Sequence, residues 1–248
     1  LLPRLAADYR VLAPDLPGFG LSAPQPLQSL QPPLGAHAAA LLDDWLGSLG
    51  VSRAVVVGTS FGGLAALRLA QRFPARVAGL MLLDSAGLGR GIHPLVRLAA
   101  LPGLTRPGVK PTRRGTDLLL RTLLAADLSE LSASQAAALS EYLYRSAAQA
   151  GTDYLARTLR LFLTPLGQRE AATPAELHPL PQPVAVVWGA RDTFLPLDAA
   201  RRAAAHLADG SFTVIEGAGH SPNWERADAV EAAIRALVRR VAPGTHCA

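Results

Sequence analysis

Three polar residues, Ser60, Asp192 and His220, lie far apart in the sequence, but each follows an apolar run and has a glycine nearby. A serine hydroxyl becomes a strong nucleophile when a histidine takes its proton, and the histidine works best when a carboxylate orients it. The sequence therefore predicts a Ser–His–Asp triad with the chain order Ser, Asp, His. Taken singly, Asp192 also fits a simple turn and His220 an ordinary loop, so the prediction depends on the three occurring together.

The serine lies in Gly58-Thr59-Ser60-Phe61-Gly62, between a β-branched run and an Ala/Leu-rich helical pattern. This order predicts a strand, a sharp turn and a helix, with Ser60 at the apex in a strained backbone conformation. Glycine is expected at 58 and 62 because a Cβ at either position would collide across the turn. The N-terminus of the helix would favour negative charge near the serine. A glycine-rich turn around an ordinary surface serine is the alternative.

Other residues with chemical potential lack such a setting. Asp84 follows a different apolar run and is the competing acid for the triad, whereas Asp15 is expected to bond backbone N–H groups in its own turn. His37 is expected on a helix surface, and four histidines follow no strand end and are assigned no chemistry: His93, His178, His206 and His246. The histidines show no metal-ligand spacing, and Gly18-x-Gly20 lacks a third glycine before a helix. The sequence therefore predicts neither a metal nor a cofactor.

The composition is that of a globular protein with a large core, since half of the 248 residues are hydrophobic and 17% are charged. The net charge is +5, but the arginines are scattered and Lys110 is the only lysine, so no nucleic-acid partner is predicted. Cys247 is the single cysteine, which excludes an internal disulfide. No apolar run reaches the roughly 18 residues of a membrane span, and no signal peptide is visible. We therefore expect a cytoplasmic protein, and the sequence leaves its oligomeric state open.

The elements that must position these residues alternate along the chain. Strands are expected at 9–13, 54–57, 77–83, 181–188 and 212–215, and helices at 36–49, 64–72, 198–207 and 226–241. Such alternation predicts an α/β fold with a doubly wound, mostly parallel sheet, in which ligands bind at the carboxyl ends of the strands. Between residues 87 and 178 only helical patterns occur, at 93–101, 116–126, 132–149 and 152–163. The chain thus divides into a first core part at 1–86, a helical insertion at 87–178 and a second core part at 179–248.

Four stretches together resemble the α/β-hydrolase superfamily, in its branch of cap-bearing serine esterases and carbon–carbon bond hydrolases. They are Asp15-Leu-Pro-Gly-Phe-Gly-Leu-Ser22, Gly58-Thr-Ser-Phe-Gly-Gly63, Trp188-Gly-Ala-Arg-Asp192 with Pro196, and Gly217-Ala-Gly-His220. The resemblance implies that Ser60 is the nucleophile, that His220 acts as base and then acid, and that Asp192 orients His220. It also implies that the backbone N–H of Phe61 belongs to an oxyanion hole and that residues 87–178 form a cap over the site.

The sequence departs from the family pattern near its N-terminal end. In this family an earlier strand ends in a His-Gly loop that supplies a second oxyanion donor, and no such pair occurs in the first fifty residues. Loss of one oxyanion donor costs about 10²–10³ in rate. The resemblance therefore predicts an N-terminally incomplete α/β-hydrolase fold that lacks the first two or three strands.

Two groups of residues in the expected cap bear on the substrate. The basic residues would attract an acidic substrate, although solvated helix faces are the favoured explanation: Arg90, Arg97, Arg106, Lys110, Arg113 and Arg114. The apolar residues fit either a pocket or packing onto the core: Leu118, Leu119, Leu123, Tyr142, Tyr144, Leu159 and Phe162. An apolar acyl group is the expected substrate feature. Trp188 and Trp224 are expected to support the acid and histidine loops.

The default function is hydrolysis of a carboxylic ester in a small molecule through an acyl-enzyme. A carbon–carbon bond hydrolase of vinylogous diketones is the runner-up, although Thr59 and Phe61 replace the Asn and Met usual in that group. Acyl transfer and cofactor-free peroxidation use the same triad. A protein that retains the fold for ligand binding, without turnover, is the alternative of a different class.

Overall fold

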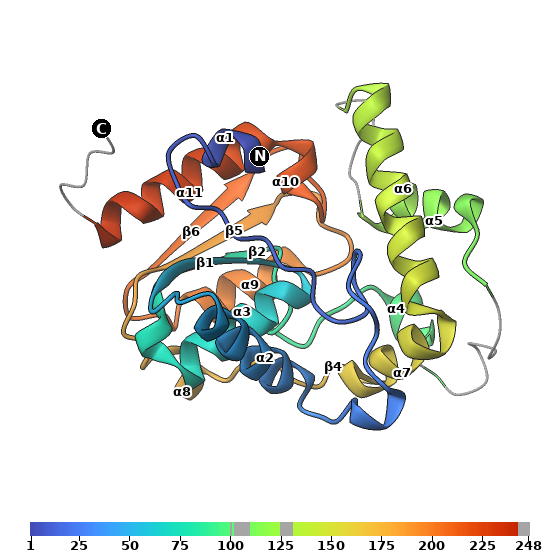
Figure 1. Ribbon diagram of the computed structural model, residues 1–248, viewed down its shortest axis with the longest axis horizontal. Coiled ribbons are helices and arrows are strands. Elements are labelled where there is room, and N and C mark those ends of the chain that lie inside the picture. Colours follow the sequence, from blue (N-terminus) through green and yellow to red (C-terminus); the bar gives the residue numbers. More distant parts are fainter. Residues whose placement is uncertain (100, 102–109, 125–130, 243–248) are drawn as a thin grey trace.

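A computed structural model describes residues 1–99, 101, 110–124 and 131–242 of the chain. At its centre lies a four-stranded parallel sheet with the order β1-β2-β5-β6 (Figure 1). The strands are β1 (Ala54–Thr59), β2 (Val77–Leu83), β5 (Val184–Gly189) and β6 (Gly210–Ile215). The last residues of neighbouring strands pair, Thr59 with Leu83 and Gly189 with Ile215. The carboxyl ends of the strands therefore meet at one edge, as the alternating pattern predicts.

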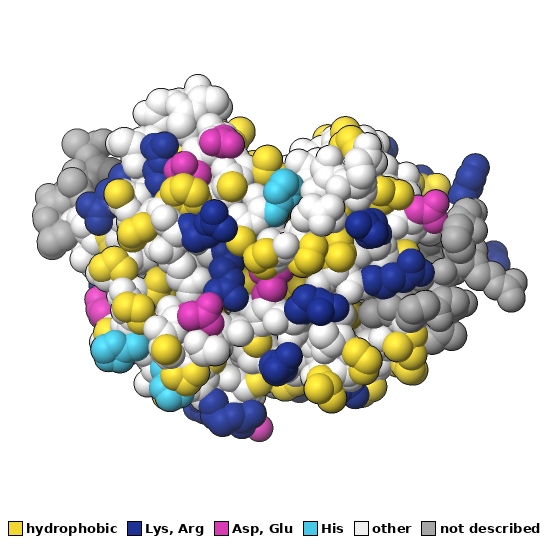
Figure 2. All heavy atoms as spheres, turned by 90° about the horizontal axis from the view of Figure 1, so that it is seen from below, with side chains coloured by type: hydrophobic (Ala, Val, Ile, Leu, Met, Phe, Trp, Pro, Cys, Tyr) yellow, Lys and Arg dark blue, Asp and Glu magenta, His cyan; other side chains and the backbone are white. Residues whose placement is uncertain are grey.

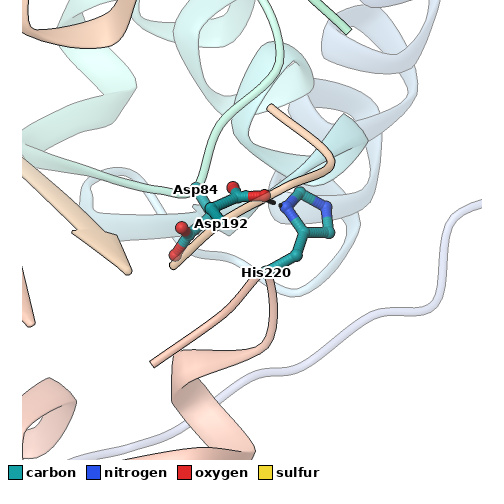
Figure 3. Close-up of side chains that lie close together, drawn as sticks. All are labelled: Asp84, Asp192 and His220. Carbon is teal, nitrogen blue, oxygen red and sulfur yellow. Dashed lines mark hydrogen bonds and ion pairs between the residues drawn. The ribbon is translucent and has the colours of Figure 1, made fainter. Parts of the chain in front are cut away.

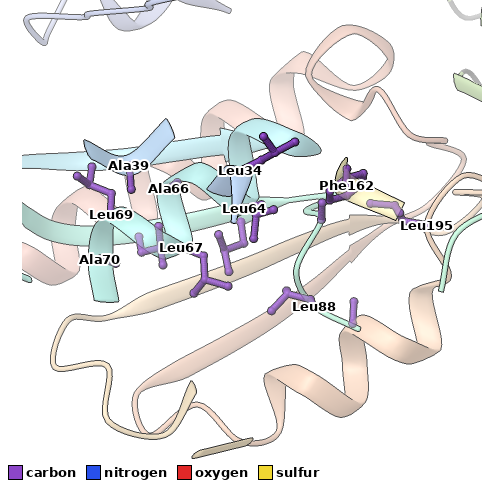
Figure 4. Packing of buried hydrophobic residues seen from close by; sticks show 14 of the residues in the cluster. Leu34, Ala39, Leu64, Ala66, Leu67, Leu69, Ala70, Leu88, Phe162 and Leu195 are labelled. Atoms are coloured by element: carbon purple, nitrogen blue, oxygen red, sulfur yellow. The ribbon is translucent and has the colours of Figure 1, made fainter. Parts of the chain in front are cut away.

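Helices cover both faces of this sheet. On one face lie α2 (Leu34–Ser48), α3 (Phe61–Arg72) and α9 (Leu197–Ala204), and on the other lies α11 (Ala227–Val241) beside α1 (Leu2–Leu5) (Figure 1). Because strand side chains alternate between faces, Leu80 and Leu82 join the α3-side cluster, whereas Met81 and Leu83 join the α11-side cluster. Figure 4 shows part of the α3-side cluster, with Leu64, Leu67 and Leu69 of α3. This two-sided burial confirms the doubly wound prediction.

The chain between β2 and β5 is mainly helical, as predicted. It contains α4 (Pro94–Ala99), α5 (Arg113–Leu119) continued by a π-helical turn (Leu120–Leu124), α6 (Ala133–Ala150), α7 (Thr152–Phe162) and α8 (Pro174–Leu177). A capping box of Ser132 and Gln135 starts α6, and Gly151, with a φ of 77°, follows its last residue. An antiparallel hairpin, β3 (Leu163–Thr164) and β4 (Gly167–Gln168), is a correction to the prediction, since strands of two residues leave no periodic pattern.

The two ends of this helical segment are joined at its base by Gln168, which is buried. Its side-chain Oε1 accepts a hydrogen bond from the Gly87 N–H at 2.8 Å, and its Nε2 donates to the Gly91 carbonyl at 2.8 Å. Its own backbone N–H donates to the Arg90 carbonyl at 2.8 Å. The chain therefore leaves and re-enters the core at adjacent points.

Residues 9–13 do not form the predicted strand. Tyr9 and Val11 pack against the α11-side cluster while Arg10 and Leu12 are exposed, which is the alternation of an extended chain. A strand also needs a hydrogen-bonded neighbour, and this segment is not part of the sheet. Periodicity alone does not reveal whether such a neighbour exists.

The first long helix begins two residues earlier than predicted. Ala39 and Leu46 are buried, whereas Leu49 is exposed and Leu41 and Trp45 are only half-buried. Short helical turns also occur at Leu27–Ser29, Pro74–Arg76 and in α10 (Pro222–Glu225).

The surface carries its positive charge in a dispersed form. On the face shown in Figure 2, Lys and Arg side chains are spread among hydrophobic and uncharged ones. Among the described residues, no helix is both long enough and apolar enough to span a bilayer. Arg106, His246, Cys247 and the side chain of Leu123 lie outside what the structure describes.

Candidate active site

Ser60 lies at the turn between β1 and α3, at the carboxyl edge of the sheet. Its φ of 52° is in the left-handed region, which a residue with a Cβ rarely adopts, so the predicted strain is present. The surrounding backbone holds it there: the Ser60 N–H donates to Leu83 O at 3.1 Å, and its carbonyl accepts from the Ala86 N–H at 2.9 Å. The end of β2 thus fixes the turn that carries the serine.

Of the two glycines predicted to avoid a collision at the turn, one does so. A Cβ on Gly58 would lie 2.3 Å from the Gly62 carbonyl oxygen, so this position requires glycine, as expected. A Cβ on Gly62 would meet nothing within 4 Å, so the collision predicted for that residue is wrong. The second close approach is at Gly63, where a Cβ would lie 2.1 Å from Ser85 Oγ. Helix α3 therefore packs against the end of β2 through the second glycine of the pair.

The structure brings Ser60, His220 and Asp192 together in one hydrogen-bonded chain. His220 Nε2 lies 3.0 Å from Ser60 Oγ, and His220 Nδ1 lies 2.9 Å from Asp192 Oδ2. The His220 side chain is 5% exposed and that of Asp192 is 0% exposed, so little water competes for these bonds. The carboxylate is fixed from behind, because Asp192 Oδ1 accepts the N–H groups of Phe194 and Leu195 at 2.8 and 2.9 Å.

The loop that carries His220 depends on two residues that sequence reasoning missed. Glu225, buried in α10, accepts the Gly219 N–H with both oxygens at 3.1 Å and the Ser221 N–H at 3.2 Å. The Phe194 ring stacks on the imidazole with the centroids 4.6 Å apart. Glu225 lies in the first turn of the helix that follows His220, and this placement is the sequence signal that would have indicated its role.

Asp84, the competing acid, lies beside the hydrogen-bonded chain of Ser60, His220 and Asp192 and not in it. It follows β2, is 0% exposed, and accepts the Gly189 N–H at 2.9 Å through Oδ1. One carboxylate oxygen of Asp84, one of Asp192 and one ring nitrogen of His220 all lie within 4.8 Å of one another (Figure 3). Burial, and then the negative charge of Asp192, raise the pKa of the Asp84 carboxyl well above its usual range.

Phe61 is the first residue of α3, so its backbone N–H has no acceptor within the helix. Its ring stacks on Phe19 at a centroid distance of 5.7 Å and meets the edge of Phe162 at 5.8 Å. A small cavity of about 30 Å³ lies beside this ring. Its lining includes Leu16 and Phe19 of the N-terminal loop, Leu34 and Leu41 of α2, and Tyr154 and Thr158 of α7.

Phe162 and Leu159 pack against the α3-side cluster. Both belong to the apolar residues between 87 and 178 that were predicted to line a pocket or to pack on the core. Leu118, Leu119 and Tyr142 are instead exposed. Hydrogen bonds tie this segment to the N-terminal loop, among them those from Tyr154 Oη to Pro17 O and from Gly20 N to Ser146 Oγ, both at 2.9 Å. Sequence periodicity identified the helices but not which of their faces meet the core.

Two supporting predictions are confirmed. Asp15 bonds backbone in its own turn, where Oδ2 accepts the Leu21 N–H at 3.0 Å. Trp188 is buried and donates its indole N–H to Leu195 O at 3.2 Å, which braces the loop after Asp192. Trp224, expected to support the histidine loop, packs beside a small cluster of the helical segment that includes Leu120.

Comparison with known proteins agrees with this architecture. Residues 1–233 match the model of the alpha/beta hydrolase family. The chain belongs to this family. It is 31% identical over 238 residues to 2-hydroxy-6-oxononadienedioate/2-hydroxy-6-oxononatrienedioate hydrolase 2 of Pseudomonas putida, which covers 92% of the chain and 76% of that relative.

Two solved structures of hydrolases are similar in shape. One is 2-hydroxy-6-oxo-6-phenylhexa-2,4-dienoate hydrolase from Rhodococcus sp. strain RHA1, with a TM-score of 0.77, 23% identity and coverage of 96% of this chain and 83% of that one. The other is a thermophilic esterase from Thermogutta terrifontis, with a TM-score of 0.69, 26% identity and the same coverage. The fold and the family expected from the four sequence stretches are therefore confirmed.

Proposed function

We propose that this alpha/beta hydrolase is a serine hydrolase that cleaves a carboxylic ester of a small molecule. The observation that carries the proposal is the continuous chain from Ser60 Oγ to His220 at 3.0 Å and from His220 to Asp192 at 2.9 Å. In this order the buried carboxylate orients the imidazole, and the imidazole takes the proton that makes the Ser60 hydroxyl a nucleophile.

In the proposed reaction, Ser60 Oγ attacks the carbonyl carbon as His220 Nε2 takes the hydroxyl proton. Asp192 holds the imidazole through Nδ1 and stabilises the imidazolium that forms. The N–H of Phe61 donates to the oxyanion, since it has no acceptor within α3. His220 then gives the proton to the leaving alkoxide, and water activated by His220 releases the acid from the acyl-enzyme.

The proposed substrate carries an apolar acyl group, and residues 87–178 act as a cap over it. Support comes from the aromatic contacts of Phe61 with Phe19 and Phe162, which give this side of the nucleophile an apolar lining. The bonds of Tyr154 and Ser146 to the N-terminal loop are consistent with a segment that closes over the same edge.

Carbon–carbon bond hydrolysis of a vinylogous diketone is the second candidate. The named activity of the 31% identical relative, a hydrolase of a 2-hydroxy-6-oxo dienedioate, favours it. The relative named as an esterase favours the first candidate at 26% identity. Both reactions would use the same serine and histidine, so substrate tests must separate them.

The test is mass spectrometry of the protein after a fluorophosphonate probe, beside Ser60→Ala. A single adduct on Ser60 that is absent from the variant supports an activated serine; no adduct on a folded sample contradicts the proposal and leaves a non-catalytic ligand-binding role. Turnover of short and long acyl esters beside a vinylogous diketone then distinguishes the two candidates.

A further inference from the structure

The second carboxyl beside the proposed triad, that of Asp84, has no place in the mechanism above. Asp84 follows β2 with a φ of 41°, a value that few residues other than glycine, asparagine and aspartate adopt. Its side chain is completely buried at the edge where the strands end. Oδ1 accepts the Gly189 N–H at 2.9 Å, but no donor reaches Oδ2 within the described part of the chain.

The carboxyls of Asp84 and Asp192 are both buried, and an oxygen of one lies within 4.8 Å of an oxygen of the other. Two such carboxyls do not both ionise, because their charges repel in a medium that solvates them poorly. Their partners decide which one holds the proton. Asp192 accepts bonds from two backbone N–H groups and lies within hydrogen-bond distance of His220 Nδ1, so donors already occupy both of its oxygens. Asp84 has one donor and a bare oxygen. The proton therefore belongs on Asp84.

We propose that Asp84 is a positioning residue of this site: it is the neutral acid of the pair and donates its proton toward the Asp192 carboxylate, which in turn orients His220. This rests on the proposed function. Asp192 then carries one negative charge, shared between an imidazole on one side and a carboxylic acid on the other. The Asp84–Asp192 pair therefore holds a single charge, which the imidazolium formed during catalysis neutralises.

The surrounding charges act in the same direction. Burial, the negative charge of Asp192 and a hydrogen bond with the Asp192 carboxyl all raise the pKa of Asp84. The charge of Glu225 raises this pKa further, while the bond from the Gly189 N–H lowers it. His220 is the remaining titratable neighbour, within the same 4.8 Å cluster. A second negative charge on Asp84 would favour the imidazolium and remove the base that Ser60 requires.

Two substitutions separate a neutral donor from an ionised acid. Asp84→Asn keeps an acceptor for Gly189 and supplies a permanent donor, and asparagine tolerates this φ. Asp84→Gly removes the side chain without backbone strain, whereas alanine would be strained at this φ. For the best ester substrate, we expect kcat of Asp84→Asn within about 3-fold of wild type, and kcat of Asp84→Gly lower by about 10-fold or more with little change in KM.

The pH–rate profile separates positioning from a purely structural role. Without its donor, Asp192 attracts the imidazolium more strongly, so the acid limb of Asp84→Gly should move to higher pH by about one unit, while Asp84→Asn should follow wild type. A loss of kcat in Asp84→Asn as large as in Asp84→Gly would overturn the proposal. So would an unmoved acid limb in Asp84→Gly.

A measurement on the resting protein keeps this test independent of the proposed reaction. Infrared absorption spectra at pH 7 should contain a protonated carboxylic acid band in wild type but not in Asp84→Asn. Glu216→Gln, a control at an exposed acid, should keep the band. A band shared by all three proteins, or absent from wild type, refutes the neutral Asp84. If wild type shows the band but neither turnover nor a Ser60 adduct, the proposed function fails while the protonation of Asp84 stands.

Discussion

Replacement of Glu225 by glutamine tests whether the loop that carries His220 depends on this buried carboxylate. Both oxygens of Glu225 accept the Gly219 N–H at 3.1 Å, and Oε1 also accepts the Ser221 N–H at 3.2 Å. Glutamine keeps one acceptor oxygen, and its NH₂ group must then face at least one of these two donors.

The expected loss of stability follows from these contacts. With its oxygen in the place of Oε1, glutamine still accepts from both N–H groups, but its NH₂ group is then buried against the Gly219 N–H, which costs about 1–3 kcal/mol. The two bonds that remain lose their charge assistance, at a cost of roughly 1 kcal/mol. Because Glu225 is only 6% exposed, solvent does little to offset either loss. We expect Glu225→Gln to lower the free energy of unfolding by about 2–4 kcal/mol.

The assay is urea unfolding of wild type, Glu225→Gln and Glu216→Gln, followed by circular dichroism. Glu216 is exposed in the same loop and is the matched control, with an expected change within about 0.5 kcal/mol. Fluorophosphonate labelling of Ser60 should also slow in Glu225→Gln, because the loop that positions His220 loses its anchor. If Glu225→Gln unfolds at the same urea concentration as the control, the loop does not depend on this carboxylate and the reasoning is refuted.

Three further outcomes can be measured on single variants. Gly58→Ala should lose soluble folded protein because its Cβ would meet a carbonyl at 2.3 Å, whereas Gly62→Ala, with nothing within 4 Å, should change the free energy of unfolding by less than about 1 kcal/mol. Asp192→Asn should lower kcat by about 10³–10⁴ while circular dichroism shows an intact fold; a loss below about 10-fold would argue against its role. Because the pKa of Asp84 is raised on folding, the folded state keeps a proton that the unfolded chain releases above about pH 4. The free energy of unfolding of wild type should therefore fall as the pH rises above about 4, by up to about 1.4 kcal/mol per pH unit. Chemical unfolding at several pH values should show that Asp84→Asn lacks this decrease.

The positions of Ser60, Asp192 and His220 could be predicted because each follows a strand at the same edge of a parallel sheet. That placement depends only on strand periodicity and on the glycines that let the chain turn back. Their hydrogen bonds follow from the same geometry. The catalytic role of the three residues stays a prediction until it is measured.

The parts that sequence did not predict depend on contacts between distant segments. Helical periodicity located α2 but not the face that it buries, because Ala, Leu and Trp surround much of this helix. Gly63 and Gly62 look alike in sequence, and only the approach of Ser85 to one of them distinguishes their roles. Glu225 and Phe194 acquire their functions from a loop and a ring brought close by the fold.

The bonds of Gln168 to Gly87, Arg90 and Gly91 have a consequence for how this protein can change over evolution. Since the helical segment is attached to the sheet through neighbouring points, insertions or deletions between them leave strand pairing and the serine turn undisturbed. The extra chain adds only a slowly growing closure entropy, on the order of 0.6 kcal/mol for each doubling of length. Selection can therefore reshape this helical segment as a separate module, while the residues at the carboxyl edge of the sheet stay in place.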